Sequence, residues 1–575
     1  MTQLRIGPLV RAVSSESVAI WTEWTDGCDV VLDATHVRAS EEQAYGAIDA
    51  MSTCSHTVKV GGHHYALLHL TGLQPATWYS YTVTAQSQEV GSVLPAEEGI
   101  IQCFRTFDLP EASAPLRVAY GSCRNLSTPE PDALSAFGSW LKAAFDEREA
   151  LWPRLLLLIG DQIYADQQTI RETFPSQNAA SRRLPRGAHT FEELASLYED
   201  AWACDAGIRQ VLAVLPTYMI FDDHEITNGW NIEPGWRVRA LRRGLEQTLV
   251  DGLVAYWLYQ GWGNLSPQQA DNHPLAELMR NATRSGEDAL ESLRAWVRHS
   301  VYQEMDPHWR YEIATMPPIF VADVRADRPA SLREVTNAAD LNVPARIMSQ
   351  KQMEELQTWM QHHASTTTIL VSSVPLLLPP VIGCAEYIAG IRPFQRGPLR
   401  CLGNALAGFQ QKLSRRMSFD HWPVFAATWR ELVKLLSQRQ HDIVVLSGDV
   451  HFSYAAQART SLFHSQKRAT LYQLVASPFR NNLSKRDRGL ILKQSLVKRL
   501  FYSGLHIAML PLVRAKGTKR VPHDLLMQNT VALVTFRPGQ TGQGEQGRYR
   551  IRQVYMGVQD GKSREIARTD FEAGW

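Results

Sequence analysis

Short apolar runs alternate with longer amphipathic stretches after residue 115, and this alternation predicts the fold class. Eight such runs occur, and most of them end in, or lead into, Gly, Asp, Ala or Ser. They are Leu116–Tyr120, Arg154–Ile159, Thr217–Phe221, Ile319–Asp323, Thr368–Val371, Ile443–Leu446, Leu471–Val475 and Val531–Phe536. Continuous apolar runs of this length are typical of strands buried on both faces. The pattern therefore predicts a layered α/β enzyme whose strands deliver polar residues at their tips.

The first hundred residues have a pattern that is typical of β-strands throughout. Val18–Trp24 is rich in β-branched and aromatic residues, and Tyr65–Val83 places apolar residues on both sides of a turn. The string Leu73–Tyr81 resembles the tyrosine corner of a fibronectin-type β-sandwich, where a tyrosine hydroxyl bonds to the backbone across the sheet corner. We therefore expect an all-β domain over residues 1–110, used for packing and positioning, and a second domain over residues 115–575.

Composition and charge describe a globular protein and exclude several other classes. The 575 residues include 59 Lys and Arg against 58 Asp and Glu, which argues against a whole-chain nucleic-acid binder, and no specific nucleic-acid-binding motif occurs. Seven scattered cysteines form no Cys-x-x-Cys pair, so a disulfide framework is disfavoured and a reducing compartment fits. The N-terminus lacks the features of a signal peptide, and no apolar run is long enough for a transmembrane segment. We therefore expect a cytoplasmic protein.

Five of the predicted strand ends carry residues that can bind a metal or a phosphate. The strings are Tyr120–Arg124, Gly160–Asp166, Asp222–Glu225, Ser372–Pro375 and Ser447–His451. Each string alone is a weak signal, because a Gly-Asp turn after a strand is common. Together, and each at the end of an apolar run, they predict one site built from several strand tips.

The order of these motifs resembles the PhoD-like alkaline phosphatase/phosphodiesterase family within the calcineurin-like metallophosphoesterases. The motifs that carry the resemblance are Gly-Ser-Cys, Gly-Asp-x-x-Tyr-Ala-Asp, Asp-Asp-His-Glu and Ser-Gly-Asp-Val-His. The resemblance covers residue 116 to the C-terminus, and the preceding β region resembles the N-terminal sandwich of that family. It implies a four-layer αββα metallophosphoesterase sandwich, preceded by the fibronectin-like domain. It also implies a di- or multinuclear centre that hydrolyses phosphate mono- or diesters with a metal-bound hydroxide.

One metal position is expected to be held by Cys123, Tyr164 and His451, with Asp161 bridging to a second metal. A carboxylate has two oxygens, and two-metal hydrolytic sites hold their ions roughly 3.5–4 Å apart. The Gly-Asp-x-x-Tyr spacing is shared with purple acid phosphatases. Thiolate, phenolate and bridging carboxylate are all anionic, so this set favours Fe³⁺.

The second metal position is expected to use Asp223 and Asp449, where the wider superfamily has Asn and His. Carboxylates in place of imidazoles shift the preference toward Ca²⁺, Mg²⁺ or Mn²⁺. His224 would be the general acid or stabilise the pentacoordinate phosphorus, oriented by Asp222 or Glu225.

Three further residues are candidates for phosphate binding. Arg124 adjoins Cys123, Asn228 follows the Asp-Asp-His-Glu motif, and Arg325 lies at another strand tip. Arginine has a planar fork that matches phosphate oxygens, but for Arg325 a structural ion pair is an equal alternative. His421 is interpreted as a packing residue.

Two basic insertions flank the last motif, at residues 382–422 and 484–520. The second has ten Lys and Arg against one acid, Asp487, mixed with apolar residues at helical spacing up to Phe501. The alternatives are an amphipathic helix packed on the domain, a cap over an anionic substrate, and a peripheral contact with anionic lipid or polyanion.

The function hypotheses follow from the site. The first is metal-dependent hydrolysis of phosphate mono- or diesters, and the alternative within enzymes is a phospholipase- or nuclease-like diesterase on the same centre. A catalytically inactive binding or scaffold protein on this fold is disfavoured, because every expected metal-ligand position is occupied by a residue that can bind metal.

Overall fold

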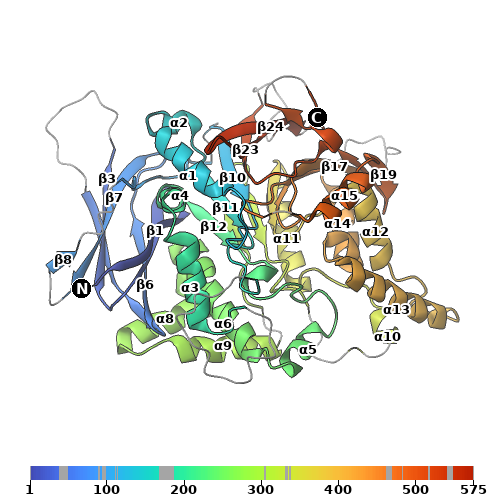
Figure 1. Cartoon of the computed structure of the whole chain (residues 1–575), viewed down its shortest axis with the longest axis horizontal. Coiled ribbons are helices and arrows are strands. Elements are labelled where there is room, and N and C mark those ends of the chain that lie inside the picture. Colours follow the sequence, from blue (N-terminus) through green and yellow to red (C-terminus); the bar gives the residue numbers. More distant parts are fainter. Residues whose placement is uncertain are drawn as a thin grey trace.

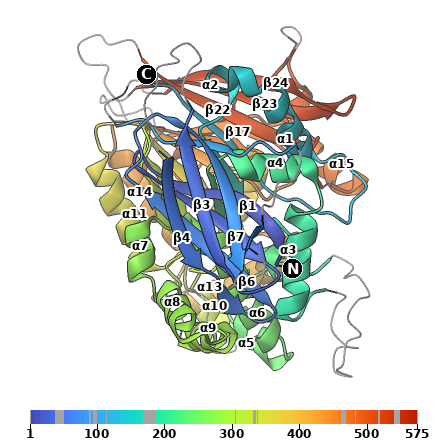
Figure 2. The same cartoon turned by 90° about the vertical axis from the view of Figure 1, so that its left-hand side faces the viewer.

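The computed structural model describes most of the chain (Figures 1 and 2). The described residues are 2–37, 50–87, 91–93, 99–110, 112, 114–167, 187–303, 306–329, 335, 338–460, 469–481, 483–515, 519–539 and 548–573. The helices are α1 (Ala133–Ala143), α2 (Arg148–Leu151), α3 (Phe191–Trp202), α4 (Ala206–Val214), α5 (Trp236–Arg242), α6 (Glu246–Tyr256), α7 (Pro267–Asn272), α8 (Pro274–Ser285), α9 (Leu290–Gln303), α10 (Ala338–Leu341), α11 (Gln350–His362), α12 (Pro380–Gly390), α13 (Arg400–Met417), α14 (Ala426–Gln438) and α15 (Lys485–Gln494).

Two antiparallel sheets form the N-terminal β-sandwich. One has the order β1 (Leu4–Val13), β2 (Ser17–Trp24), β6 (His63–Thr71), β5 (Val58–Val60). The other has the order β4 (Ala50–His56), β3 (Asp29–His36), β7 (Trp78–Ser87), β8 (Gly91–Val93), with β9 (Cys103–Arg105) also paired to β7. The expected tyrosine corner is confirmed, because the buried Tyr79 accepts a hydrogen bond from the Gln74 backbone N–H at 2.9 Å.

Two further sheets follow in the chain, and they contain all eight strands that the apolar runs predict. The seven-stranded sheet has the order β12 (Thr217–Ile220), β11 (Leu155–Ile159), β10 (Leu116–Gly121), β22 (Thr530–Pro538), β23 (Tyr549–Gln559), β24 (Lys562–Ala573), β21 (Val513–Arg514). The eight-stranded sheet has the order β13 (Tyr311–Ile313), β14 (Ile319–Ala322), β15 (Thr368–Ser372), β16 (Ile443–Ser447), β18 (Thr470–Val475), β17 (Tyr454–Thr460), β20 (Leu505–Met509), β19 (Arg499–Tyr502).

Helices cover the outer faces of these two sheets, which gives the expected αββα order of layers. Side chains alternate along β15, so that Ile369 and Val371 pack in the core toward the seven-stranded sheet. Leu370, between them, belongs to the separate apolar cluster formed with α11 and α14. On the other side, α1 packs against β22, β23 and β24. Each sheet therefore buries both of its faces, which explains why its central strands are uniformly apolar.

The β-sandwich packs against α4 and β12, at the opposite end of the molecule from α12 and α13 (Figure 1). Arg11, on β1, is fully buried and donates to the backbone oxygens of Tyr259 and Gln260 and to Asn264 Oδ1. Tyr81 of β7 donates to the Ala213 carbonyl at the end of α4. These contacts fit a positioning role for the sandwich.

The second basic insertion is helical over only part of the stretch whose spacing suggested a helix. Helix α15 ends at Gln494, and the segment that follows forms β19, which pairs antiparallel with β20. Gly504 lies between the two strands with a φ of 78°, a conformation that glycine adopts without strain and that allows the tight turn. Residues 516–518 of this insertion lie outside the described residues. Among the helices that the structure describes, none is both long and apolar enough to cross a membrane.

Candidate metal centre

The candidate site lies where the carboxyl ends of parallel strands from both sheets meet. Strands β10, β11 and β12 are parallel neighbours in one sheet, and β14, β15 and β16 are parallel neighbours in the other. Four expected ligands, just beyond these strand ends, have positive φ values: 59° at Cys123, 53° at Asp161, 68° at Asp449 and 59° at His451. Each such backbone conformation costs a non-glycine residue of order 1–3 kcal/mol, and such residues cluster at functional sites. Four expected ligands therefore share this uncommon backbone conformation at the strand ends.

Two glycines allow these turns to approach one another. A Cβ atom on Gly160 would lie 2.4 Å from the Asp222 Cβ, and one on Gly448 would lie 2.2 Å from Ser122 Oγ. Non-bonded atoms at such separations overlap severely, so these positions require glycine. The Gly-Asp motifs are thus needed for close packing of the turns as well as for the carboxylates.

The first set of expected ligands is brought together. Asp161 Oδ2 lies 3.3 Å from Cys123 Sγ and 3.3 Å from the Tyr164 hydroxyl. The Tyr164 oxygen lies 3.2 Å from His451 Nε2, and Asn481 Nδ2 donates to that oxygen at 3.0 Å. Ligand atoms of Cys123, Asp161 and His451 lie within 4.8 Å of one another, so one cation can contact all three.

Asp161 is also shared with the second set of expected ligands. It forms a group with Asp223 and His224, and another with Asp222 and Asp449, in each of which the candidate atoms lie within 4.8 Å of one another. Asp161 is therefore the carboxylate that these candidate groups have in common. The sequence did not single out Asp222 as a member of this cluster.

The carboxylate that orients His224 is not one of the two expected from the sequence. His224 Nδ1 lies 2.9 Å from Asp166 Oδ1, in the loop after β11. Asp222 instead forms an ion pair with Arg325. Glu225 accepts backbone N–H groups from the turn after β11 at 3.1 and 2.8 Å. Asp166 could have been considered because it ends the Gly-Asp-x-x-Tyr-Ala-Asp motif.

Arg325 is a buried cation among the acidic residues of the site. It is 1% exposed, forms ion pairs with Asp222 and Asp420, and lies 3.9 Å from Asp223 and 3.6 Å from Asp449. The ion pair that the sequence offered for Arg325 is present, and Arg325 is also among the residues that line the site cavity. Its positive charge offsets part of the repulsion between these carboxylates.

Arg124 is not placed to bind phosphate, and that expectation is wrong. Its Nε donates to Asp132 Oδ2 at 2.7 Å and its Nη1 to the Ala201 carbonyl at 2.5 Å, and the side chain is buried. The guanidinium therefore links loops behind the site. Asn228 lies at the site cavity, and its backbone N–H donates to Asp166 Oδ2 at 2.9 Å.

His421 belongs to the site, contrary to its interpretation as a packing residue. Its Nε2 lies 3.3 Å from Asp449 Oδ2, and its Nδ1 lies 2.6 Å from Glu386 Oε1 on α12. Asp420, His421 and Asp449 form a further group of atoms that could hold a cation. No strand-tip signal could have found His421, because it follows the end of α13.

Comparison with known proteins identifies the family. The family described as PhoD-like phosphatase matches residues 119–499, which is most of the chain. The chain belongs to the PhoD-like phosphatase family. Residues 1–98 match a domain of unknown function, DUF7800, and no curated protein matches. Membership indicates a metal-dependent phosphatase that acts on a phosphate ester.

Solved structures are similar in fold. A structure described as PhoD is 13% identical, with a TM-score of 0.56, over 98% of this chain and 88% of that one. Purple acid phosphatase PPD1 from seeds of yellow lupin (Lupinus luteus) is 10% identical, with a TM-score of 0.44, over 97% of this chain and 73% of that one.

The charge distribution of this PhoD-like site fits bound cations. Burial raises the pKa of Asp161 and of Asp222 well above the usual range, and it does the same for the Cys123 thiol, where Asp161 and Asp449 add to the effect. Asp222 Oδ2 has no hydrogen-bond partner although it is buried. A buried group of acids with too little positive charge is costly, and a bound cation would favour the ionised forms. The ligand atoms present therefore suit metal ions.

A cavity of about 390 Å³ opens over the ligands of the PhoD-like centre. His224, Asn228 and His421 line its polar side. Apolar residues of α12 and α15 line the other side; they are Val381, Ile382, Ala385, Leu490 and Ile491. The site thus combines a charged floor with an apolar wall.

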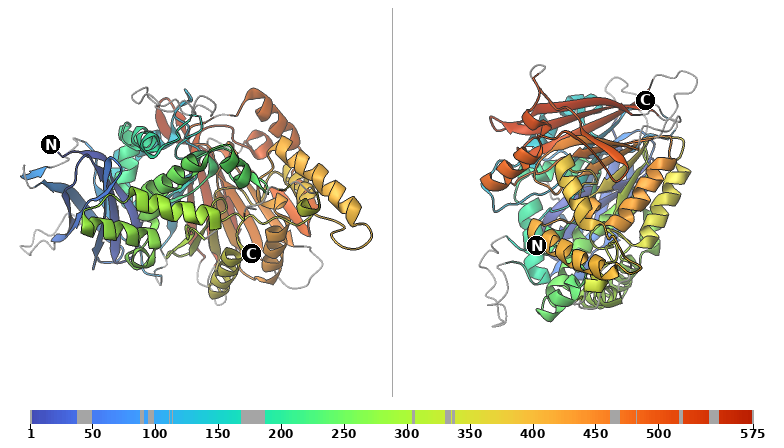
Figure 3. Two further views of the ribbon diagram at one scale, coloured as in Figure 1. Left: turned by 90° about the horizontal axis from the view of Figure 1, so that it is seen from below. Right: turned by 90° about the vertical axis from the view of Figure 1, so that its right-hand side faces the viewer.

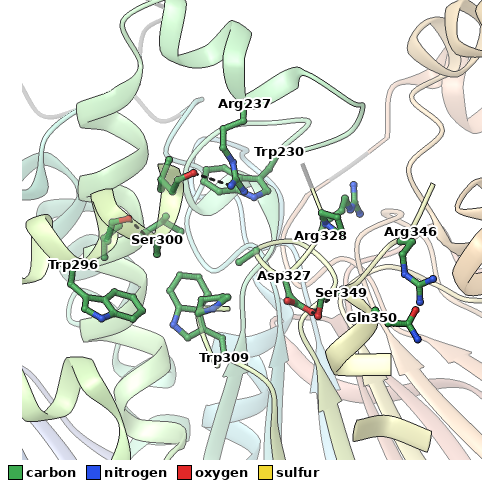
Figure 4. Close-up of a pocket in the computed structure, with 16 residues that line it drawn as sticks. Trp230, Arg237, Trp296, Ser300, Trp309, Asp327, Arg328, Arg346, Ser349 and Gln350 are labelled. Atoms are coloured by element: carbon green, nitrogen blue, oxygen red, sulfur yellow. Dashed lines mark hydrogen bonds between the residues drawn. The ribbon is translucent and has the colours of Figure 1, made fainter. Parts of the chain in front are cut away.

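A second cavity, of about 360 Å³, lies outside this centre. Trp230, Trp296 and Trp309 line it together with Arg237 and Arg328 (Figure 4). None of the expected metal ligands is among its lining residues. It is therefore separate from the candidate metal centre.

Proposed function

We propose that this PhoD-like phosphatase hydrolyses phosphate mono- and diesters at the centre around Asp161. The observation that carries the proposal is that Asp161 belongs to three groups of candidate ligand atoms, which together include the expected ligands Cys123, His451, Asp223 and Asp449. Cys123, Tyr164 and His451 would hold a ferric ion with Asp161, because three of these four ligands are anionic when bound. Asp223 and Asp449 would hold Ca²⁺, Mg²⁺ or Mn²⁺ with the same carboxylate.

Bound cations would supply positive charge to the phosphoryl oxygens and lower the pKa of a water molecule. His224 would supply the proton for the leaving oxygen. Asp166 accepts from the Asn228 backbone as well as lying against His224 Nδ1, so the imidazole is held in one orientation from behind. His224 Nε2 is then the nitrogen that would face the leaving group. The Asn228 side-chain amide would donate a hydrogen bond to a phosphate oxygen.

The inactive-scaffold alternative has little support. A protein that had lost catalysis would be expected to have lost some of the expected ligands, whereas here Cys123, Asp161, Asp223, Asp449 and His451 all belong to groups whose candidate ligand atoms lie within 4.8 Å of one another. Diesters are included among the proposed substrates because of the cavity. Its apolar wall offers room for an organic group beside the phosphoryl group.

The role of His224 is tested with leaving groups of different basicity. The full chain should hydrolyse 4-nitrophenyl phosphate and bis(4-nitrophenyl) phosphate, and His224→Gln should lose ~10²–10⁴-fold on an alkyl phosphate. The loss should be much smaller on 4-nitrophenyl esters, because 4-nitrophenolate leaves without a proton. His362→Gln, on the exposed face of α11, is the matched control. Equal losses on both substrate classes would remove His224 as the proton donor, and no hydrolysis by metal-loaded parent would refute the proposed function.

A further inference from the structure

Exposed large apolar side chains gather on one part of the described structure. Seven of them are more than half exposed, and six of these lie in two segments, residues 388–409 and 496–501. They are Ile388 (54%), Leu399 (51%), Leu402 (56%), Phe409 (65%), Leu496 (68%) and Phe501 (55%). Single exposed apolar residues are ordinary, but a concentration of them marks an interaction surface.

These residues belong to elements that lie together at one end of the molecule. Helices α12, α13 and α15 and strand β19 lie at the end opposite to the β-sandwich (Figures 1 and 3). Helix α12 packs against both α13 and β19. We call this surface the α13–β19 face, formed by the exposed residues of 388–417 and 485–501.

The α13–β19 face is continuous with the apolar wall of the site cavity. Met417, at the end of α13, is 45% exposed and lines the cavity. Leu490, on α15, is 47% exposed and also lines it. The two residues connect the outer surface with the space above His224 and His421. A molecule with an apolar chain could therefore extend from the metal centre to the surface along these apolar side chains.

The α13–β19 face is also strongly basic. Residues 388–417 contain six Lys and Arg and no acid, and residues 485–501 contain six Lys and Arg and one acid, Asp487. Three of these twelve basic side chains are not counted as available to an external partner. Arg392 is buried, Arg415 pairs with Glu233, and Lys498 pairs with Asp524. Nine remain against one acid in a chain whose total charges nearly balance.

We propose that the α13–β19 face docks on an anionic lipid bilayer, so that the site cavity receives an amphiphilic phosphate ester from the membrane. Mixed basic and apolar side chains match the headgroup region of such a bilayer, where cations meet lipid phosphates and apolar groups insert. A symmetric contact with a second copy of the chain would bring two basic faces together, and their charges would repel. A soluble polyanion would account for the basic side chains of the face but not for its exposed apolar ones. The substrate part of this inference rests on the proposed function, but the docking part does not.

Docking is tested by sedimentation of the full chain with phosphatidylcholine vesicles containing about 30% phosphatidylserine, and with vesicles of phosphatidylcholine alone. The parent should bind the anionic vesicles preferentially. The double variants Leu402→Ser/Phe409→Ser and Lys493→Glu/Arg499→Glu should each bind at least ~10-fold more weakly. The matched controls change exposed residues elsewhere, namely Leu109→Ser/Leu151→Ser and Lys562→Glu, and should bind like the parent.

Turnover separates the two parts of the inference. Each variant should hydrolyse a soluble aryl phosphate at the parental rate, but the two face variants should lose turnover of a phosphomonoester lipid presented in the anionic vesicles. Failure of the parent to bind vesicles, or face variants that bind like the parent, would overturn docking. A parent that dimerises and whose dimer is disrupted by Leu402→Ser/Phe409→Ser would replace the bilayer with a second copy. Vesicle binding without any aryl phosphate hydrolysis would refute the proposed function and leave docking intact.

Discussion

His63 offers a prediction about how the β-sandwich is held on the catalytic region. The imidazole is 3% exposed on β6, with Nδ1 2.5 Å from Glu23 Oε1 and Nε2 2.8 Å from Glu192 Oε2 on α3. Burial alone would lower the pKa of His63, but the hydrogen bonds to Glu192 and Glu23 outweigh it and raise the pKa to about 9. The charged histidine thus joins the two regions.

The raised pKa of His63 determines how much its charged form adds to the free energy of unfolding, and over which pH range. The difference between about 9 in the folded state and about 6.5 in the unfolded state corresponds to about 3 kcal/mol. Because the folded state binds the proton more tightly, this stabilisation is fully present below pH ~6.5 and is lost as the pH rises through about 9. His63→Gln removes the titrating group, so its free energy of unfolding should lack this dependence.

The assay is urea denaturation of the full chain and the variant at pH 6, 8 and 10. The gap in unfolding free energy between parent and His63→Gln should narrow by about 3 kcal/mol from pH 6 to pH 10. His56→Gln is the matched control, because His56 pairs with Asp29 on the surface, where both side chains are more than half exposed. A gap that stays constant over this pH range would refute the assignment of a buried charged pair.

Three further predictions concern the site. Arg325→Gln should lower the free energy of unfolding by ~3–5 kcal/mol, because it leaves buried carboxylates unpaired, and urea denaturation should detect this; parental stability would contradict it. Gly448→Ala should abolish hydrolysis by displacing the turn through its contact with Ser122, whereas Gly489→Ala, with no atom within 4 Å, should keep parental activity; an active Gly448→Ala would contradict the packing argument. If iron is bound, the protein should absorb visible light, and Cys123→Ser should shift that band and lower the iron content; a colourless, iron-free, active protein would refute the ferric assignment.

The strands and their tips could be predicted from the sequence because local chemistry determines them. Buried parallel strands need apolar residues on both faces, so runs such as Ile443–Leu446 stand out, and the site residues follow at their ends. Strands β23 and β24 carry polar residues at alternate positions and did not stand out. The helical spacing up to Phe501 was misleading, because residues 499–502 form β19. Pairing of β19 with β20 overrides the local helix propensity of this segment.

The partners of the site residues depend on tertiary structure and could not be predicted. The sequence suggested that Asp222 orients His224. In the structure Arg325, which follows a strand of the other sheet, forms an ion pair with Asp222, and Asp166 orients the imidazole instead. His421 arrives from a helix end, where no motif marks it. Arg124 is adjacent to an expected ligand in the chain, yet it is directed to Asp132 behind the site.

Metal content measured together with turnover tests the central claim most directly. Asp161→Asn replaces the shared carboxylate by a neutral amide, which is a poorer bridging ligand. Elemental analysis of the purified parent should find more than one metal equivalent per chain, and Asp161→Asn should lose metal and phosphate-ester hydrolysis together. Asp205→Asn, at the N-cap of α4, where asparagine caps equally well, should keep both. A parent that hydrolyses phosphate esters without bound metal, or an Asp161→Asn variant with parental metal content and activity, would contradict the account.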